Sequence, residues 1–175
     1  MDEKNLSIIV IKSEMSSSFY ETLMSVCRQL NYNDNIEVIL ADAVDGTAYE
    51  LCRKYGEDDN TLLLDKVRFV DISSQIFENM AQIKNESVKY ATNRRVLILT
   101  DNQILQEGII EKCLLTDRIE VSDDELQSYY NAGTDAFSYL VADRDTFSSI
   151  GGWNSGLACN EDYELFIRAC NYNCH

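Results

Sequence analysis

Short, almost entirely apolar runs restrict the fold of this chain more than any other feature of its sequence. The runs lie at 6–11, 36–41, 67–70 and 96–99. Most of them lack polar alternation, which indicates strands buried on both faces of a sheet. Segments with apolar residues at helical spacing lie between them, at 16–30, 47–55 and 75–91. Because strands alternate with helices, the sequence predicts an α/β fold with a Rossmann-like, mostly parallel sheet sandwiched by helices.

The last third of the chain departs from this pattern without adding a second domain. Residues 136–141 predict one more strand, 151–153 predict a loop, and an amphipathic helix is expected from about Asn160. A chain of 175 residues fits one domain. No low-complexity segment or flexible linker divides the sequence. We therefore expect a single domain over residues 1–175.

The charge balance argues against two classes of partner. The chain has 30 acidic and 15 basic side chains and a net charge of −15. Nucleic acid and anionic lipid both bind basic surfaces, so neither is an expected partner.

No apolar stretch approaches the roughly 20 residues of a membrane span, and the amino terminus lacks the features of a signal peptide. Isolated cysteines within apolar segments favour reduced thiols, and we expect a cytoplasmic protein without a transmembrane segment.

Three loops are candidate ligand sites, because open parallel sheets bind ligands beyond the carboxyl ends of their strands. They are residues 12–14, 42–47 and 100–103. The first, Lys12-Ser13-Glu14, predicts an ordinary polar turn. The other two loops are more distinctive because of their aspartates.

Several segments follow one another in an order that has a known counterpart. A strand ends in Asp42, residues 80–85 read Met-Ala-Gln-Ile-Lys-Asn, residues 150–153 read Ile-Gly-Gly-Trp, and residues 161–165 read Glu-Asp-Tyr-Glu-Leu. These segments resemble the strand-terminal Asp, the Ala-Arg-Asn, the Ile-Gly-Gly-Phe and the Glu-Asp-Tyr-x-Leu of family 2 glycosyltransferases. The resemblance covers nearly the whole chain and implies a GT-A-type fold.

That family transfers a sugar from a nucleotide diphosphate donor to an acceptor hydroxyl, usually with inversion, and the resemblance implies the same reaction here. An inverting transfer needs a carboxylate that takes the proton of the attacking hydroxyl. By resemblance Asp162 is the candidate base, with Glu161 as second choice, and Trp153 lines the acceptor pocket. The residues alone also admit a structural interpretation, in which both carboxylates favour the positive end of a helix and Trp153 anchors the core.

The resemblance also implies a donor site. Asp42 occupies the position of the family's nucleobase-binding aspartate, where a carboxylate accepts from the N3–H of uracil. Five further residues are implied in donor binding, namely Asp45, Lys84, Asn85, Asp101 and Arg144. For two of these residues a simpler role is equally consistent with the sequence, a helix N-cap for Asp45 and a surface ion pair for Arg144.

The metal-binding motif of the family differs most in this chain. The family's Asp-x-Asp holds Mg²⁺ or Mn²⁺, which neutralises the leaving diphosphate, whereas this chain reads Thr100-Asp101-Asn102. Alignment with the family puts Thr100 and Asn102 at the two Asp positions and Asp101 at the variable one. The candidate metal ligands are therefore Asn102, through its carbonyl oxygen, and Asp101, if the motif is shifted by one residue. Loss of anionic ligands weakens cation binding and supports an alternative function. In that alternative the chain is a catalytically inactive GT-A-like domain that binds a sugar, a nucleotide or a partner protein.

The expected ligands are a nucleotide-sugar donor and a saccharide or other hydroxyl acceptor. Family members usually carry further acceptor elements after the helix that begins with Glu-Asp, and this chain ends soon after that helix. From the resemblance we therefore expect either a chain truncated at its C-terminus or a minimal protein that needs a partner for the acceptor side. The sequence leaves open whether it acts as a homo-oligomer or with a partner protein.

Overall fold

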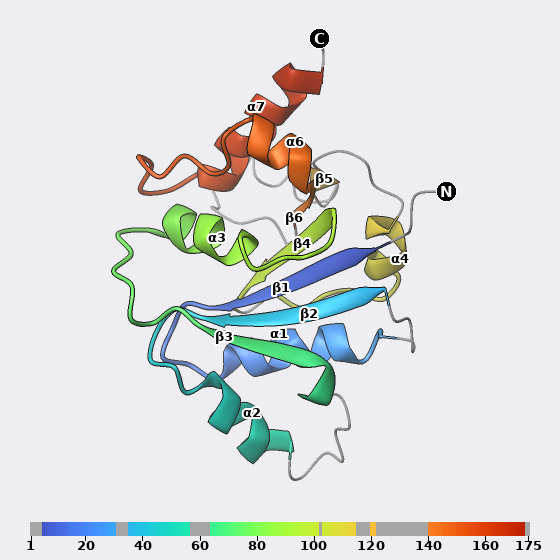
Figure 1. The fold of residues 1–175 in the computed structure, drawn as a ribbon, viewed down its shortest axis with the longest axis vertical. Coiled ribbons are helices and arrows are strands. Elements are labelled where there is room, and N and C mark those ends of the chain that lie inside the picture. The colour runs from blue at the N-terminus through green and yellow to red at the C-terminus, as the bar shows by residue number, and fades with distance from the viewer. Residues whose placement is uncertain are drawn as a thin grey trace.

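The structure is a computed structural model, and it describes residues 5–30, 35–56, 64–101, 103–114, 120–121 and 140–173. Its centre is a six-stranded sheet in the order β3-β2-β1-β4-β6-β5 (Figure 1). Four strands run parallel, namely β1 (Leu6–Lys12), β2 (Ile36–Asp42), β3 (Val67–Asp71) and β4 (Arg95–Thr100). The other two are antiparallel to their neighbours, β6 (Leu140–Asp143) to β4 and β5 (Glu120–Val121) to β6. The predicted mostly parallel α/β sheet is confirmed.

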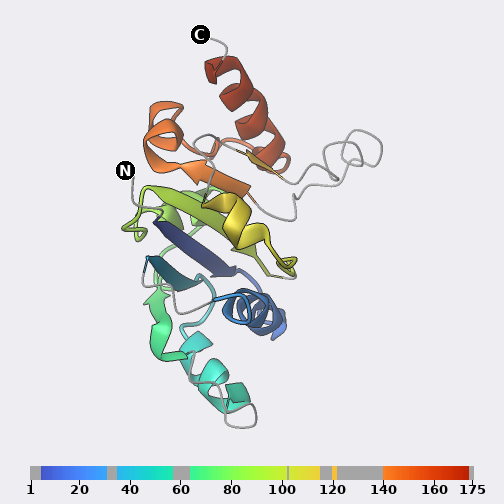
Figure 2. The same cartoon turned by 90° about the vertical axis from the view of Figure 1, so that its right-hand side faces the viewer.

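Helices cover both faces of this sheet. In chain order they are α1 (Ser18–Cys27), α2 (Ala48–Gly56), the 3₁₀ turn η1 (Leu64–Lys66), α3 (Met80–Val88), α4 (Ile109–Cys113), α6 (Arg144–Ser149) and α7 (Glu161–Asn173). Residues of α1, α2 and α4 form one core with the sheet, and residues of α3, α6 and α7 form the other. Figure 2 shows α1 alongside the strands and α7 at the end of the molecule that carries the C-terminus. Among the helices in the described ranges, none combines the length and hydropathy that crossing a bilayer requires.

The central strand β1 explains why the apolar runs lack a polar face. Ile8 and Val10 belong to the core beneath α1, α2 and α4, whereas Ile9 and Ile11 belong to the core on the opposite face. All four side chains are 0% exposed. Burial of one such side chain contributes roughly 1.5–3 kcal/mol. Since helices cover both faces, each position of the strand must be filled by an apolar or internally paired side chain.

The helix predicted at 75–91 begins later than its periodicity indicates. α3 starts at Met80, because Asn79 caps it by accepting a hydrogen bond from the backbone N–H of Gln82 at 3.1 Å. Ile76, which the periodicity placed on the apolar face of the helix, lies before the cap and is 94% exposed. That part of the prediction is wrong. Of the strand predicted at 136–141, residues 136–139 lie outside the described ranges.

The register of the parallel strands brings their carboxyl ends together at one edge of the sheet. Lys12 lies opposite Asp42, Asp42 opposite Asp71, and Ile11 opposite Thr100. We call this the carboxyl edge. It is the edge at which open α/β sheets bind their ligands.

Candidate functional site

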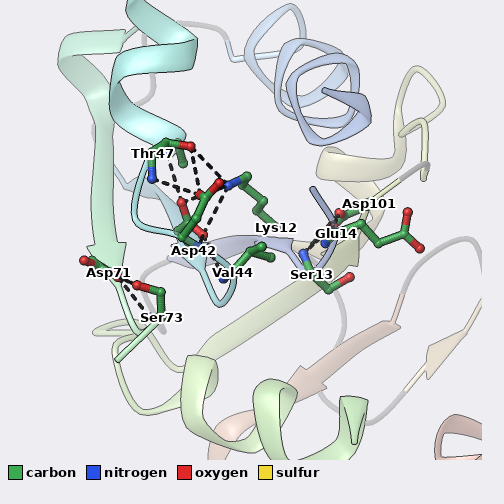
Figure 3. Close-up of polar contacts among 11 residues, drawn as sticks. Lys12, Ser13, Glu14, Asp42, Val44, Thr47, Asp71, Ser73 and Asp101 are labelled. Atoms are coloured by element: carbon green, nitrogen blue, oxygen red, sulfur yellow. Dashed lines mark hydrogen bonds and ion pairs between the residues drawn. The ribbon is translucent and has the colours of Figure 1, made fainter. Parts of the chain in front are cut away.

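The first polar group at the carboxyl edge surrounds a buried lysine (Figure 3). Lys12, the last residue of β1, is 1% exposed. Its Nζ lies 3.2 Å from Asp42 Oδ2 and also donates to Asp45 Oδ1 and, at 3.4 Å, to Thr47 Oγ1. We call these four residues the Lys12 cluster. Lys12, predicted to lie in an ordinary polar turn, therefore forms an internal ion pair that was not predicted from the sequence.

The carboxylate of Asp42 is fully engaged within its own loop. Its Oδ1 accepts hydrogen bonds from the backbone N–H groups of Val44 at 2.9 Å and Asp45 at 3.2 Å, and its Oδ2 accepts from Ala48 N–H at 2.9 Å. A carboxylate offers about four lone-pair positions. Three amides and the ammonium group of Lys12 occupy them. In this arrangement Asp42 organises the loop that leads into α2, and no acceptor position is left for a nucleobase.

Asp45 completes the Lys12 cluster from a more exposed position. Its Oδ1 accepts from Thr47 N–H at 3.1 Å and Thr47 Oγ at 2.8 Å. The hydrogen bond from Lys12 is the main reason that the pKa of this carboxyl is lowered to about 2. The adjacent Gly46 has φ +70°, and a Cβ there would lie 2.7 Å from Asp71 Oδ2. Glycine is therefore required for the turn that brings Asp45 to the lysine.

Asp101 connects the end of β4 to the loop that follows β1. Its Oδ1 and Oδ2 accept from Ser13 N–H at 2.9 and 3.1 Å, and Oδ2 also accepts from Glu14 N–H at 3.0 Å. Burial raises the pKa of the Asp101 carboxyl, although these hydrogen bonds oppose the shift. Figure 3 shows Asp101 directed at this loop, beside the Lys12 cluster. The contacts indicate that Asp101 supports the backbone at the carboxyl edge.

Only one of the two expected metal ligands, Asp101, lies within the described residues. Its oxygens accept three hydrogen bonds from the backbone amides of Ser13 and Glu14, which leaves one of about four lone-pair positions, on Oδ1. Its expected fellow ligand, Asn102, lies outside the described ranges. Within those ranges, no three side chains of the His, Cys, Asp or Glu type come together as a metal site would require. The chemistry derived below therefore includes no step through a metal ion.

The second polar group surrounds another buried lysine, on α3. Lys84 is 4% exposed, and its Nζ lies 2.7 Å from both Asp162 Oδ1 and Asp162 Oδ2 and 3.0 Å from Glu161 Oε1. Glu161 and Asp162 stand in the first turn of α7 and are also buried. The indole N–H of Trp153 donates to Asp162 Oδ1 at 2.6 Å. We call these four residues the Lys84 cluster.

The carboxylate of Asp162 differs from that of Asp42 in keeping one acceptor position. Oδ1 receives Lys84 and Trp153, while Oδ2 receives only Lys84 among the described residues. One of about four lone-pair positions therefore remains, on Oδ2. Asp162 also lines a cavity of ≈ 10 Å³, room for about one water. The cavity is lined by Lys84, Ile98, Thr100, Gln103, Leu140, Trp153 and Asp162.

A larger cavity, of ≈ 600 Å³, lies between α1 and the segment that precedes α4. None of the described residues that were predicted as site residues lines it. Its size is typical of ligand pockets, but it holds no part of either cluster. The candidate site is therefore the narrower region at the carboxyl edge.

Trp153 is held by α3 as well as by Asp162. Asn85 donates through Nδ2 to the Trp153 carbonyl at 2.8 Å and accepts through Oδ1 from the Trp153 N–H at 3.0 Å. The indole is 2% exposed and packs on Phe147, with ring centroids 4.8 Å apart. Gly152 has φ +69°, and a Cβ there would lie 2.5 Å from Asn85 Oδ1. Trp153 thus anchors the core, and Asn85 positions the loop that carries it.

Arg144 lies at the opposite end of the sheet from the two clusters. Its neighbour Asp143 lies opposite Arg95, the first residue of β4, in the register of the β4–β6 pair. Arg144 Nη1 donates to the carbonyl of Ala91 at 2.6 Å. Because β6 runs antiparallel to β4, this position is remote from the carboxyl ends of the parallel strands. The structure does not bring Arg144 together with Asp42 or Lys84, and we leave it out of the donor site.

The fold is similar to that of solved glycosyltransferases. A mannosyltransferase from Pyrobaculum calidifontis, PcManGT, in complex with GDP-Man and Mn²⁺, matches 89% of this chain with a TM-score of 0.63 and 12% identity. S. aureus TarS 1–349 in complex with UDP matches 95% with a TM-score of 0.67 and 13% identity. The chain has the GT-A fold.

The likeness to these GT-A structures is one of fold. No family model and no curated protein sequence matches the chain. The chain spans 49% of the length of PcManGT and 55% of TarS 1–349. The likeness thus extends over about half of each of these neighbours, and activity has to be inferred from the residues at the carboxyl edge.

Proposed function

We propose that this chain is the GT-A domain of an inverting glycosyltransferase that transfers a sugar from a nucleotide diphosphate donor to an acceptor hydroxyl. The observation that carries the proposal is the state of Asp162. It is a buried carboxylate at the carboxyl edge that has one acceptor position left on Oδ2 and lines a cavity. A group of this kind can accept the proton of a hydroxyl that donates to it.

The proposed reaction uses Asp162 as general base. The acceptor oxygen attacks the anomeric carbon of the donor sugar while its proton passes to Asp162 Oδ2. The bond between that carbon and the diphosphate oxygen breaks, and the nucleoside diphosphate leaves with the electron pair. Glu161 shares the ammonium group of Lys84 with Asp162 and contributes negative charge beside the base.

We place the donor at the carboxyl edge, next to the Lys12 cluster. PcManGT was solved with GDP-Man and TarS with UDP, which supports a nucleotide donor for the GT-A fold. In this chain Asp42 and Asp45 act on the donor indirectly, by holding the loop between β2 and α2. The proposal includes no step through a metal ion, because Asp101 is the one expected ligand within the described residues and its carboxylate already accepts hydrogen bonds from two backbone amides.

A second candidate function is binding without transfer. Asp42 has no acceptor position left for a nucleobase, and Asp101 is engaged by the loop after β1. Both observations favour a GT-A domain that has lost donor binding and retains a surface for a sugar or a partner protein. Nucleotide binding separates the two candidates.

The test is a transfer assay with UDP- and GDP-sugars, run both with Mn²⁺ and with EDTA, in which release of the nucleoside diphosphate is measured. We expect Asp162→Asn to lower kcat by about 10²–10⁴-fold, the usual contribution of a positioned base, with unchanged donor affinity by calorimetry. Asp145→Asn is the matched control, because Asp145 is an exposed aspartate in the first turn of α6. Absence of nucleotide binding in both conditions would reject the enzyme and leave the second candidate.

A further inference from the structure

We infer that Lys84 is a positioning residue, which holds Asp162 for proton transfer and does not bind the donor diphosphate. The inference rests on the proposed function for its catalytic meaning. It also makes a structural claim of its own, that the ammonium group of Lys84 determines where the Asp162 carboxylate and the Trp153 indole lie. The resemblance to family 2 glycosyltransferases had placed Lys84 among the donor-binding residues.

The hydrogen-bonding capacity of Lys84 carries the first step. A lysine ammonium group has three N–H donors. Three carboxylate oxygens lie within hydrogen-bond distance of Nζ, namely both oxygens of Asp162 at 2.7 Å and Glu161 Oε1 at 3.0 Å. No donor is left for a phosphate oxygen.

The position of Lys84 on α3 carries the second step. The next residue, Asn85, binds the backbone N–H and the carbonyl of Trp153, while Lys84 binds the carboxylate that receives the Trp153 indole N–H. Nζ also lies 5.6 Å from the centroid of the Trp153 ring. Two consecutive residues of one helix thus hold both ends of the Trp153–Asp162 hydrogen bond. Loss of Lys84 removes the contact that fixes the carboxylate in this arrangement.

Trp153 makes the inference measurable without an assay of transfer. It is the single tryptophan of the chain, which also has 10 tyrosines, so fluorescence excited selectively at tryptophan reports on the Lys84 cluster. A change in the hydrogen bond between its indole N–H and Asp162 alters the environment of the fluorophore. Any variant that moves the Asp162 carboxylate should therefore change the emission spectrum.

The experiment compares Lys84→Gln with Lys89→Gln in the full chain. Lys89, just beyond α3, is the matched control, because its side chain is 68% exposed and its ion pair is with Glu86. We expect Lys84→Gln to lower kcat by about 10²-fold, the effect of a misplaced catalytic group, with the KM for the nucleotide sugar within about twofold of wild type. Its emission spectrum should change in the same direction as that of Asp162→Asn. Lys89→Gln should change neither quantity.

Lys84→Arg is the second variant, because a guanidinium group can also bind a carboxylate with two hydrogen bonds. We expect it to restore the wild-type emission and part of kcat. If the glutamine variant does not fold, the arginine variant decides by its kinetics: a lowered kcat with unchanged donor KM supports the inference, and a raised donor KM with unchanged kcat overturns it. A large rise in donor KM with unchanged kcat in Lys84→Gln would overturn the inference, since that is the signature of a donor-binding residue. So would an emission spectrum identical to wild type. A wild-type chain that transfers no sugar would reject the proposed function, and the fluorescence comparison would still decide the role of Lys84.

Discussion

The two lysine clusters use the same ion-pair arrangement at the same edge of the sheet, but their carboxylates are held differently. Lys12 and Lys84 are both buried, and each binds two carboxylates. Asp42 is held by backbone amides two, three and six residues further along its own loop. Asp162 is held by side chains from elsewhere, Lys84 at a separation of 78 residues and Trp153 at a separation of nine.

The difference shows which of the two carboxylates is available for chemistry. A carboxylate saturated by its own loop shapes the backbone, and its removal unfolds that loop. One that is assembled from distant side chains, with an acceptor position left over, can interact with a ligand. Burial and ion pairing alone do not distinguish the two cases, because both clusters have them.

The largest expected effect on stability is in the Lys12 cluster. Asp42→Ala removes the buried carboxylate partner of Lys12 and leaves the more exposed Asp45. It also leaves three backbone N–H groups without their acceptor, so we expect a loss of about 3–5 kcal/mol in the free energy of unfolding. Urea denaturation followed by circular dichroism measures it. Asp71→Ala is the control, because Asp71 lies opposite Asp42 on the neighbouring strand and, among the described residues, its side chain accepts hydrogen bonds only from Ser73 in its own exposed turn. Equal losses in the two variants would show that Asp42 has no special structural role.

A smaller loss is expected in the Lys84 cluster when a single hydrogen bond is removed. Trp153→Phe keeps an aromatic ring against Phe147 but deletes the indole N–H that donates to Asp162. We expect a loss of about 1.5–3 kcal/mol, the usual range for a hydrogen bond to a charged group. Urea denaturation by circular dichroism gives the value. A loss as large as that of Asp42→Ala would contradict the view that Asp162 is the less constrained carboxylate.

The turn of the Lys12 cluster provides a third comparison. Gly46→Ala places a Cβ at φ +70° and 2.7 Å from Asp71 Oδ2, and the backbone conformation alone should cost about 1–2 kcal/mol. Gly108→Ala is the control, because Gly108 has φ +82° with nothing within 4 Å of the added Cβ. The difference in thermal unfolding between the two variants isolates the effect of the close approach to Asp71. Equal stabilities would mean that the Asp71 side chain moves aside freely.

The smallest effect concerns acid stability. The pKa of Asp45 is lowered from 3.8 to about 2 by Lys12 and Thr47, so the folded state binds this proton less readily than the unfolded state does. The contribution of Asp45 is present above pH 4 and is lost as the pH falls towards 2. The midpoint of thermal unfolding should therefore fall less steeply between pH 4 and pH 2 in Asp45→Asn than in wild type. Parallel curves would argue against the ion pair with Lys12.

Much of the fold follows from local sequence patterns. The strands β1, β2 and β4 are predicted because runs of residues such as Ile8, Ile9 and Val10 can only be accommodated where both faces of a sheet are covered. The start of α7 at Glu161 also agrees with the sequence, since acidic residues favour the first turn of a helix. The start of α3 was misplaced, because the Asn79 cap outweighs the periodicity that continues through Ile76.

The candidate site was less accessible to sequence reasoning, because its partners depend on register and on distant packing. Lys12 meets Asp42 only because β1 and β2 pair in parallel at that position. A signal was present, since a lysine that ends an apolar strand needs an internal partner when it is buried. The partnership of Lys84 with Asp162 depends on how α7 packs against α3, and no local pattern encodes it. The position of Arg144 likewise depends on register, because the antiparallel direction of β6 places it away from the carboxyl edge.

The hydrogen bonds of Asn85 make two distant positions of the sequence depend on each other. Its amide matches the N–H and the carbonyl of Trp153 as a neighbouring β-strand would. Aspartate could accept but not donate, and glutamine would place the same groups one methylene further away. Gly152 is constrained in turn, because any side chain there would collide with the same amide. Among distant chains of this fold, a helical asparagine and a Gly-Gly-aromatic loop should therefore be retained together or lost together.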